Sequence, residues 1–422
     1  MRKIYLFLFI SCLAAIEVNA QFSIGGEVRP RTEYRHGFKT LASEDAKAAF
    51  FTEQRSRLYF DYKSDKVAAK ITLQDIRLWG GATQVYKSDA ALTNVYEAWG
   101  QYNFTETLSI RVGRQALDYD NARILGNLGW AAQGRSHDLA LFQWQKNQSK
   151  WHVGAAFNQE DVLSPSEPGR LKNSYYFLGG NYKTMQFSWF NQAFESGNVS
   201  FLVLNNGVQS AADSAVYFSQ TAGAYAVKKL GKVSLNGEAY YQFGKNPAGK
   251  SIGAFLVAAN ITYPVGKTPV TLGVDYLSGA SSTSSKDNAF NPLYGTHHKF
   301  YGYMDYFYVG NGHSNVGIKD LYLTAKFKLS EKGALETSVH QFISGSEIPS
   351  ADNSSYKTNL GTELDLVFSQ AFNKDVLLHV GYSQMMATSS MEIIKPGGSS
   401  SAFNNWAWVM LTIKPTLFES AP

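Results

Sequence analysis

Cysteine is almost absent from this chain of 422 residues. Its one cysteine, Cys12, lies in an apolar N-terminal stretch that we expect to be removed, so the mature chain carries no thiol. A chain without thiols has no disulfide framework, no thiolate metal site and no cysteine nucleophile. This absence suits a protein that crosses an oxidising periplasm unfolded, where stray thiols pair wrongly.

The N-terminal apolar stretch itself is too short to cross a membrane. Two basic residues precede it, and small residues at Val18 and Ala20 fit the positions that signal peptidase reads. We therefore predict a signal peptide over residues 1–20, cleaved after Ala20. Two alternatives stay open, which are a retained N-terminal anchor helix and lipidation at Cys12.

Long apolar runs are missing from the rest of the chain, because glycine, asparagine, serine or a charged residue interrupts every hydrophobic stretch. This pattern excludes helical membrane spans. Proline is scarce at 11 residues, whereas the chain has 27 Phe, 25 Tyr, 8 Trp and 36 Gly. The aromatic girdles and glycine-bearing strands of a transmembrane barrel explain this combination better than a soluble core does. The net charge of +5 is small for this length and does not indicate nucleic-acid binding.

Charged residues near the mature N-terminus alternate with uncharged ones. Glu27, Arg29, Arg31, Glu33 and Arg35 occupy every second position. Successive side chains of a strand point to opposite faces, so all five lie on one face. The pattern returns in a second segment with Glu53, Arg55, Arg57, Asp61 and Lys63. Strands that are charged on one face and apolar on the other predict a barrel with a wet lumen and lipid outside.

About twenty segments of this alternating kind follow one another, each close to the length of a tilted barrel strand. We predict an all-β fold, a transmembrane antiparallel β-barrel over residues 21–422 with about 18 strands (16 to 18). Beyond the two charged segments, the candidates are 67–78, 94–104, 107–115, 138–145, 151–159, 174–182, 186–193, 200–208, 216–227, 233–243, 253–263, 270–277, 300–309, 318–329, 334–343, 360–372, 376–386 and 405–414.

The connections between these segments alternate in length. Short turns, expected to face the periplasm, are 64–65, 183–184 and 230–232. Longer connections, expected to face outward, are 162–173, 278–299, 344–358 and 388–403. The stretch 40–50 is a weak candidate for a short helix or a plug element.

Arginine is missing from the last 252 residues (422 − 170), because all twelve arginines lie at or before Arg170. If the first third of the barrel points them into the lumen, one sector of the wall is electropositive and binds carboxylates or phosphates bidentately. Alternatively, they pair with neighbouring acids and make the wall rigid. The two interpretations are compatible.

A polar connection without hydrophobic periodicity occupies the segment between the 107–115 and 138–145 candidates. It begins after Gly-Arg-Gln at 113–115, contains Gly-Asn-Leu-x-Trp at 126–130 and ends with Gln-Gly-Arg-Ser-x-Asp at 133–138. Such a loop can fold into a barrel mouth and set a constriction. Together with the early Arg-x-Arg and Arg-Ser-Arg strands and the stretch 290–307, these motifs resemble the alginate-export family of outer-membrane barrels. The resemblance spans about residues 25–414.

This resemblance implies an 18-stranded barrel in the outer membrane of a Gram-negative bacterium, whose positively charged lumen passes an acidic polysaccharide outward. Matching positions for the lumen are Arg55, Arg57, Arg111, Arg114, Arg123 and Arg135, with Asp118, Asp120 and Asp138 as balancing acids. The first charged segment adds Arg29 and Arg31. Two features depart from the family pattern: the later strands lack arginine, and Phe418 is followed by four more residues instead of ending the chain.

Two clusters resemble chemical sites. His297 and His298, with His313 and Asp305, suggest a metal site, but the first two are adjacent rather than spaced to share a face, so we favour a loop or rim role. Ser136-His137-Asp138 contains the letters of a hydrolase triad, yet neighbours in a strand point to alternate faces. No nucleotide, phosphate or zinc motif occurs, so no cofactor and no enzyme activity are predicted.

The sequence therefore predicts a passive channel with an arginine-lined, anion-preferring lumen. Its expected partners are membrane lipid, acidic saccharides or other small anions, and periplasmic proteins of export or uptake, but not nucleic acid. Two alternatives stay open, which are a plugged structural or adhesive barrel and an outer-membrane lipid-modifying enzyme.

Overall fold

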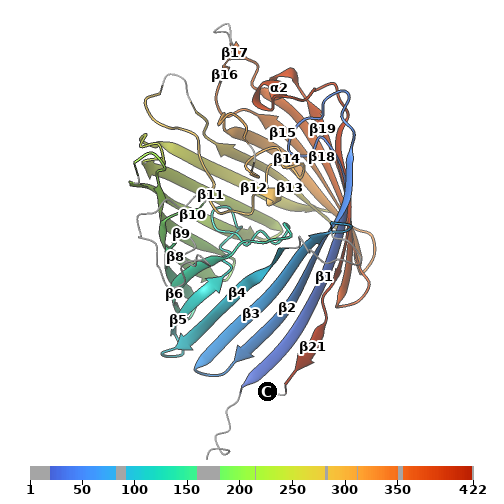
Figure 1. The fold of residues 1–422 in the computed structure, drawn as a ribbon. Helices are drawn as coiled ribbons and strands as arrows, with labels where there is room; N and C mark the ends of the chain where they lie inside the picture. The colour runs from blue at the N-terminus through green and yellow to red at the C-terminus, as the bar shows by residue number, and fades with distance from the viewer. Residues whose placement is uncertain are drawn as a thin grey trace, which may run out of the picture.

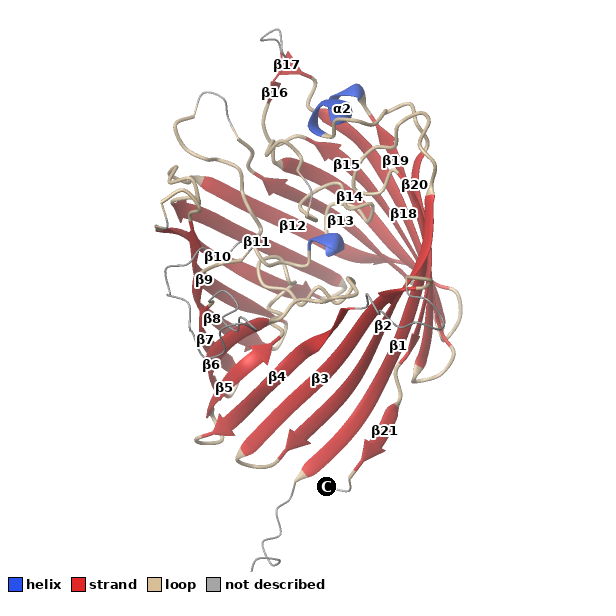
Figure 2. Ribbon diagram, in the orientation of Figure 1, coloured by secondary structure: helices blue, strands red, loops and turns tan. Residues whose placement is uncertain are grey.

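The computed structural model describes residues 20–81, 92–158, 181–213, 215–280, 284–310, 312–349 and 355–420. The described chain is a closed antiparallel β-barrel with very little helix (Figures 1 and 2). Apart from residue 20, the predicted signal peptide lies outside the described residues. In the described part of the chain, no helix has the length and apolar character needed to span a membrane.

The wall consists of long strands that follow one another in chain order. They are β1 (Gln21–His36), β2 (Ala49–Lys63), β3 (Val67–Leu78), β4 (Leu92–Asn103), β5 (Leu108–Gln115), β6 (His137–Lys146), β7 (Ser149–Phe157), β8 (Thr184–Phe194), β9 (Gly197–Gln209), β10 (Val216–Leu230), β11 (Val233–Gly244), β12 (Ala254–Val265), β13 (Thr268–Leu277), β14 (Ile318–Lys328), β15 (Gly333–Ile343), β18 (Asn359–Ala371), β19 (Val376–Ala387), β20 (Asn404–Ile413) and β21 (Thr416–Glu419). A hairpin of β16 (Ile348–Pro349) and β17 (Ser355–Tyr356), the short turn of helix η1 (His297–Lys299) and helix α2 (Ser389–Ile394) lie in the connections.

The first strand closes the barrel by pairing with the last one. On one side β1 pairs with β2 along its length, and on the other it pairs with β20 and then β21, which are separated by Lys414 and Pro415. Because β20 and β21 share one position beside β1, the 19 strands of the sheet fill 18 positions (19 − 1). The predicted strand number and fold class are therefore confirmed.

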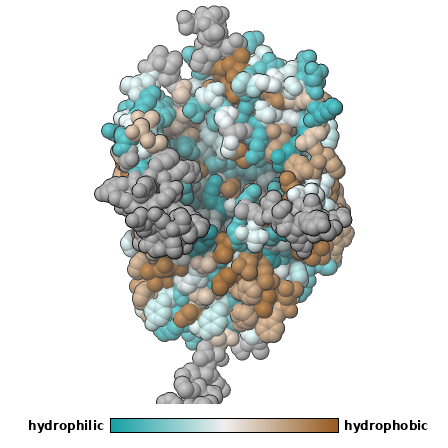
Figure 3. All heavy atoms as spheres, viewed as in Figure 1, coloured by the Kyte–Doolittle hydropathy of each residue, from teal (hydrophilic) through white to brown (hydrophobic). Residues whose placement is uncertain are grey.

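The alternation of charge along β1 separates an inner from an outer face. Glu27, Arg29, Arg31 and Glu33 are all buried, whereas Val28 between them is 43% exposed. Large apolar side chains are exposed on the outward face of most other strands too, and brown patches cover the wall below the loops in Figure 3. Charges inside and apolar residues outside are what a barrel surrounded by lipid requires.

The connections differ sharply between the two ends of the barrel. Both described chain ends and all the short turns, such as 64–66 and 231–232, lie at one end, which we name the turn end. The long connections lie at the opposite, loop end. Two of them fold back into the lumen, namely the first inner loop (116–136) and the second inner loop (284–310 and 312–317) (Figure 1).

Most of the strand candidates are confirmed, with three corrections to the segments. Residues 300–309 form turns of the second inner loop rather than a strand, because their aromatic side chains pack inside the lumen instead of facing lipid. Residue 183 ends a long connection at the loop end and residue 184 begins β8, so 183–184 are not a short turn. Residues 40–48 form no helix. Most of the 174–182 candidate and the 162–173 connection lie outside the described residues.

Aromatic residues of the inner loops build a core within the barrel. Tyr301, Tyr306 and Phe307 are at most 1% exposed and pack with apolar residues at the loop end of the strands, including Phe342 and Trp406. Burial of this kind stabilises by roughly 25 cal/mol per Å² of apolar surface. The inner loops are thus held as a packed layer across the lumen.

Candidate functional site

Three arginines of the predicted ladder hold the first inner loop against β1 and β2. Arg29 donates from Nη1 and Nη2 to the first two of three successive carbonyl oxygens at 129–131, at 2.7 and 2.9 Å. Arg31 donates to the second of them at 2.9 Å and Arg55 to the first at 3.1 Å. We name this contact the guanidinium clamp. Its arginines are buried wall residues that position the first inner loop.

Two of these arginines are also paired with acids of the same wall. Arg55 contacts Glu27 at 2.6 Å, and Arg31 contacts Glu33 at 2.8 Å and Glu53 at 3.1 Å. Of the two interpretations of the ladder, pairing within the wall therefore accounts for much of the charge. Most of the other guanidinium N–H groups of these arginines donate to the loop carbonyls of the guanidinium clamp.

The inner loops meet beside the guanidinium clamp in an aromatic stack. The Trp130 ring lies 4.5 Å from that of His298 and 4.7 Å from that of Trp408. The Arg31 guanidinium lies 4.4 Å from the Trp130 ring. His298 in turn contacts Asp305 at 2.6 Å. Planar groups from both loops and from β20 thus pack together beside the guanidinium clamp.

Arg123 of the first inner loop reaches the opposite wall. It contacts Glu238 of β11 at 2.9 Å and Asp275 of β13 at 2.7 Å, and it donates to the Tyr301 hydroxyl at 2.7 Å. Burial alone would lower the pKa of Arg123, but Asp275 and Glu238 hold that pKa well above its usual value. Arg123 is therefore a fixed cation that joins both inner loops to the wall.

Carboxylates of β18 hold the second inner loop through its backbone. Glu363 accepts the Met304 N–H at 2.8 Å, and Asp365 accepts the Tyr303 N–H at 3.3 Å. Gly302, with a φ of +78°, approaches so closely that a Cβ would lie 2.5 Å from a Glu363 oxygen. We name this contact the carboxylate clamp.

At the loop end, a cavity of about 420 Å³ lies between the inner loops and β1–β2. Figure 3 shows a hollow with hydrophilic residues at this end. We name the cavity the cationic pocket, because its charged lining residues are Arg31, Arg35, Lys39 and Arg135 with the acids Glu53 and Asp305, besides two histidines. Arg135 donates to the Gly295 carbonyl at 2.9 Å, and burial lowers the pKa of Arg135 to about 10. It stays charged at neutral pH.

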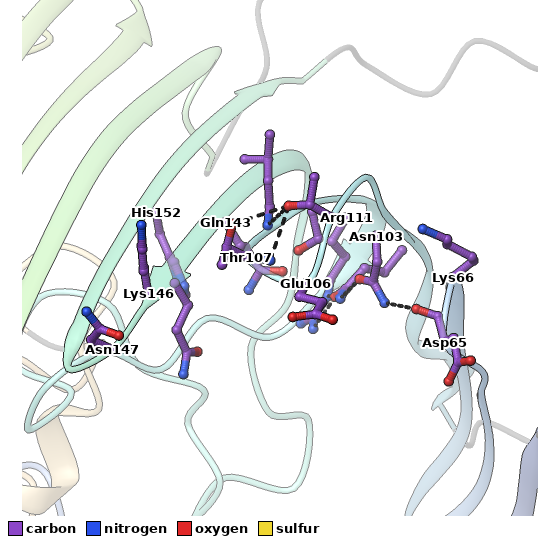
Figure 4. A pocket seen from close by; sticks show the side chains of 15 residues that line it. Asp65, Lys66, Asn103, Glu106, Thr107, Arg111, Gln143, Lys146, Asn147 and His152 are labelled. Atoms are coloured by element: carbon purple, nitrogen blue, oxygen red, sulfur yellow. Dashed lines mark hydrogen bonds between the residues drawn. The ribbon is translucent and has the colours of Figure 1, made fainter.

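At the turn end, a cavity of about 1170 Å³ lies against β4–β7 (Figure 4). We name it the turn-end cavity. Arg111 points into it, donates to the Gln101 amide oxygen at 3.0 and 2.8 Å and lies 4.0 Å from the Trp99 ring. The charged lining residues besides the histidine are Lys66, Arg111, Lys146, Asp65 and Glu106.

A third cavity, of about 400 Å³, faces the other wall and has the opposite balance of charge. We name it the acidic pocket. Its acids are Asp120, Glu238, Asp275 and Glu336, and its permanent cations are Arg123 and Lys299. Charge is thus distributed unevenly around the lumen, as the missing arginines of the later strands predict.

The prediction that Arg114 and Asp138 line the lumen is wrong, because both side chains face outward. Arg114 and Asp138 lie opposite each other in β5 and β6 and form a bidentate pair at 2.8 Å. Both are exposed and share the outward face with Val112 and Phe142. Arg111 and Arg114 are three positions apart, and strand alternation places such residues on opposite faces. The sequence itself therefore contained the signal for this correction.

The remaining predicted residues lie inside the barrel. Arg57 donates to Gln74 at 2.8 Å and lies 3.7 Å from the Tyr96 ring. Asp118 accepts from Asn127 at 3.1 Å, and burial raises the pKa of this carboxyl. Burial also raises the pKa of Asp120. Arg57 and Asp118 hold neighbouring polar groups in place, whereas Asp120 lines the acidic pocket together with Arg123.

Neither the Ser-His-Asp sequence at 136–138 nor the histidine cluster forms a chemical site among the described residues. His137 is buried inside while Asp138 points outward, as expected for neighbours in a strand. His297 contacts the Tyr308 carbonyl at 2.7 Å, and His298 contacts Asp305. The described ranges contain no group of three or more side chains arranged to hold a metal ion. Both histidines are loop residues, although they lie inside the lumen rather than at its rim.

Sequence reasoning missed the residues that anchor the second inner loop. Glu363 and Asp365 are two positions apart in a strand, which is the same alternation that revealed the ladder. Arg35 has the parity of Arg29 and Arg31 and lines the cationic pocket. The packing role of Trp130 could not be predicted from its motif, since its partners His298 and Trp408 lie far away in the sequence.

Comparison with solved structures finds barrels of the same architecture. OpdK, an outer-membrane protein of Pseudomonas aeruginosa, matches at a TM-score of 0.62 with 10% identity, over 94% of this chain and 99% of its own. OccAB4 of Acinetobacter baumannii matches at 0.63 with 10% identity, over 95% and 99%. A BenF-like porin of Pseudomonas fluorescens Pf-5 matches at 0.63 with 11% identity, over 94% and 99%. At such identities the likeness shows the fold.

Sequence comparison places the chain more specifically. No curated protein is detectably similar to it in sequence. The family profile described as alginate export matches residues 20–389, which include the charged strands, both inner loops and most of the barrel wall. The chain therefore belongs to the alginate-export family of β-barrels.

Proposed function

We propose that this protein is an outer-membrane diffusion channel that favours anions, and that acidic saccharides or other small anions pass through its lumen. One observation carries the proposal. The cationic pocket lies at the loop end of the barrel and the turn-end cavity at the other end, and in each the permanent cations outnumber the acids. Cations along a lumen lower the barrier for a carboxylate and still release it.

The proposed path follows the sector of β1–β7, where arginine is concentrated. The arginines of the guanidinium clamp are largely occupied by carbonyls and acids. Arg35 is also paired with Glu33 at 2.8 Å, but its side chain is 31% exposed, compared with 7% for Arg31. The proposed solute therefore meets chiefly Arg35 and Arg135 at the loop end, and Lys66, Arg111 and Lys146 at the turn end. The sequence contains no nucleotide-binding motif, so in this proposal a gradient or a periplasmic partner gives the direction of transport.

A pair of arginines in one strand offers a matched test. Arg111 points into the turn-end cavity and Arg114 points outward. Refolded protein in a planar bilayer under a salt gradient gives a reversal potential whose sign reports ion preference. We expect anion selectivity that falls in Arg111→Met and is unchanged in Arg114→Met. Cation selectivity, or an Arg111→Met channel with the parent's reversal potential, would overturn the proposal.

A second candidate function is a barrel with a closed lumen. The packed aromatic layer of the inner loops, with Tyr301 and Tyr306 almost fully buried, favours it. Its mark in the same experiment is the absence of any conductance. A released inner loop would then create conductance where the parent has none.

A further inference from the structure

A fourth cavity, of about 430 Å³, adjoins the cationic pocket at the loop end. It lies between the second inner loop and β9–β11, and the two cavities share His297, Tyr308 and Gly310. Its volume falls in the range of roughly 300–1,000 Å³ that is usual for small-molecule sites. A solute that enters the cationic pocket from the loop end thus has a second pocket beside it.

The chemistry of this fourth cavity differs from that of its neighbour. Five side-chain amides line it, and its only ionic residues besides histidine are Lys245 and Asp287, whose charges balance. We name it the amide pocket. Its amides are those of Asn206, Gln242, Asn246, Asn291 and Asn315, and Tyr217, Phe290 and Tyr308 add aromatic surface.

Some of these amides are already used to hold the pocket in shape. Gln242 donates to the Asn291 carbonyl at 2.7 Å and accepts the Asn291 N–H at 2.9 Å, which fixes the loop to β11. Asn206 accepts from the Tyr294 hydroxyl at 2.7 Å. The wall of the amide pocket is therefore preorganised.

Two buried polar atoms of the lining have no partner among the described residues. They are the Tyr308 hydroxyl and His313 Nδ1, whose rings lie 4.5 Å apart. His313 is only 5% exposed. Burial, and secondarily Lys395, lower the pKa of His313 to about 4, so its imidazole is neutral at neutral pH. A buried polar atom without a partner is destabilising unless a ligand or water satisfies it.

We propose that the amide pocket binds an uncharged, hydroxyl-bearing sugar unit while the cationic pocket holds an acidic unit of the same saccharide. Sugar hydroxyls donate and accept, as side-chain amides and a neutral imidazole do. A saccharide charged on every unit would place a carboxylate where the one cation, Lys245, is balanced by Asp287. The preferred solute therefore carries acidic and neutral units side by side. This inference rests on the proposed function, of which it narrows the substrate class.

The test compares three saccharide probes on the refolded full chain. They are maltotriose, which is neutral, trigalacturonic acid, which is charged on every unit, and cellobiouronic acid, which has one acidic and one neutral unit. Residence times are read from current blockades in a planar bilayer, and affinities from titration calorimetry in detergent, which does not require an open channel. We expect cellobiouronic acid to bind most tightly.

Matched variants separate the two pockets. His313→Phe keeps a ring and removes Nδ1, and Tyr308→Phe removes only a hydroxyl without a protein partner. Loss of one hydrogen bond should weaken maltotriose and cellobiouronic acid about two- to tenfold and leave trigalacturonic acid unchanged. Arg135→Met should weaken both acidic probes and leave maltotriose unchanged.

The outcomes distinguish this inference from the proposed function. Tightest binding of trigalacturonic acid, or unchanged binding of all probes in both His313→Phe and Tyr308→Phe, would overturn the amide pocket as a site even in an anion-selective channel. A channel without anion preference that still binds maltotriose through His313 would overturn the proposed function and leave the sugar site standing.

Discussion

Two regions of the barrel wall hold the inner loops through side chains of opposite charge. On β1 and β2, arginine N–H groups donate to backbone carbonyls of the first inner loop. On β18, carboxylates accept backbone N–H groups of the second inner loop. Every backbone has both N–H donors and C=O acceptors. Arginines can therefore anchor a loop through its carbonyls, and carboxylates can anchor a loop through its N–H groups. Much of the uneven charge around the barrel therefore anchors the inner loops, whatever it contributes to ion selectivity.

Arg123 does not follow this division. It belongs to the loop held by arginines, yet its own guanidinium lies between Glu238 of β11 and Asp275 of β13. Without it, these two carboxylates would face each other in a buried site. The comparison therefore predicts different consequences for arginines that hold carbonyls and for the one that neutralises acids.

The largest expected effect follows from Arg123→Met. Removing one partner of a buried ion pair leaves uncompensated charge and costs about 3–5 kcal/mol. We expect a marked fall in the denaturant concentration that unfolds the refolded barrel, measured by the shift in gel mobility. Arg123→Lys retains the cation and should lose less. Equal stability of Arg123→Met and the parent would contradict the conclusion that Arg123 stabilises the barrel by bridging Glu238 and Asp275.

Arg29→Met should release the first inner loop while leaving the wall intact. Arg29 donates to three carbonyls and forms no ion pair within 4 Å among the described residues, so its loss leaves no acid unpaired by contact. Charge-assisted hydrogen bonds contribute about 1.5–3 kcal/mol each. We expect a larger and noisier single-channel conductance. Arg114→Met, on the outer face, is the control and should match the parent; an unchanged Arg29→Met trace would contradict the clamp.

A pair of glycines tests the carboxylate clamp. Gly302→Ala would press a Cβ against Glu363, whereas Gly310→Ala in the same loop, at a φ of +66°, meets no atom within 4 Å. Both substitutions carry the backbone strain of a left-handed residue, about 1 kcal/mol. The close contact should add about 1–2 kcal/mol for Gly302→Ala alone. Protease susceptibility of the loop measures the difference, and equal susceptibility would argue against tight docking on β18.

A further prediction concerns pH at the loop end. Lys395 is buried after α2 and donates to the Gly312 carbonyl at 2.7 Å. Burial, followed by repulsion from Lys39, lowers the pKa of Lys395 from 10.5 to about 7. The undocked loop then binds more protons between pH 7 and 10.5, so docking strengthens as pH rises through this window. Hydrogen exchange of 388–403, corrected for intrinsic rates, should slow accordingly, and Lys395→Met should abolish this dependence.

The wall could be predicted from sequence because strand alternation is local. The 67–78 candidate coincides with β3, and the parity of Arg29 and Arg31 gave their inward face. The segment 300–309 misled for a physical reason, since its aromatic residues suit a lipid-facing strand and a core inside the lumen equally well. The clamps could not be predicted, because their acceptors and donors are backbone groups that leave no mark in the sequence.

The layer across the lumen also has a consequence for how the molecule assembles. Its contacts join residues that are distant along the chain: Arg29 and Trp130 are 101 positions apart, and Arg123 and Tyr301 are 178 apart. Contacts of such high sequence separation form late, because chain closure must precede them. The neighbouring hairpins of the wall carry no such delay. We therefore expect folding to proceed through a closed but hollow barrel, and filling of its interior to be the slow final phase.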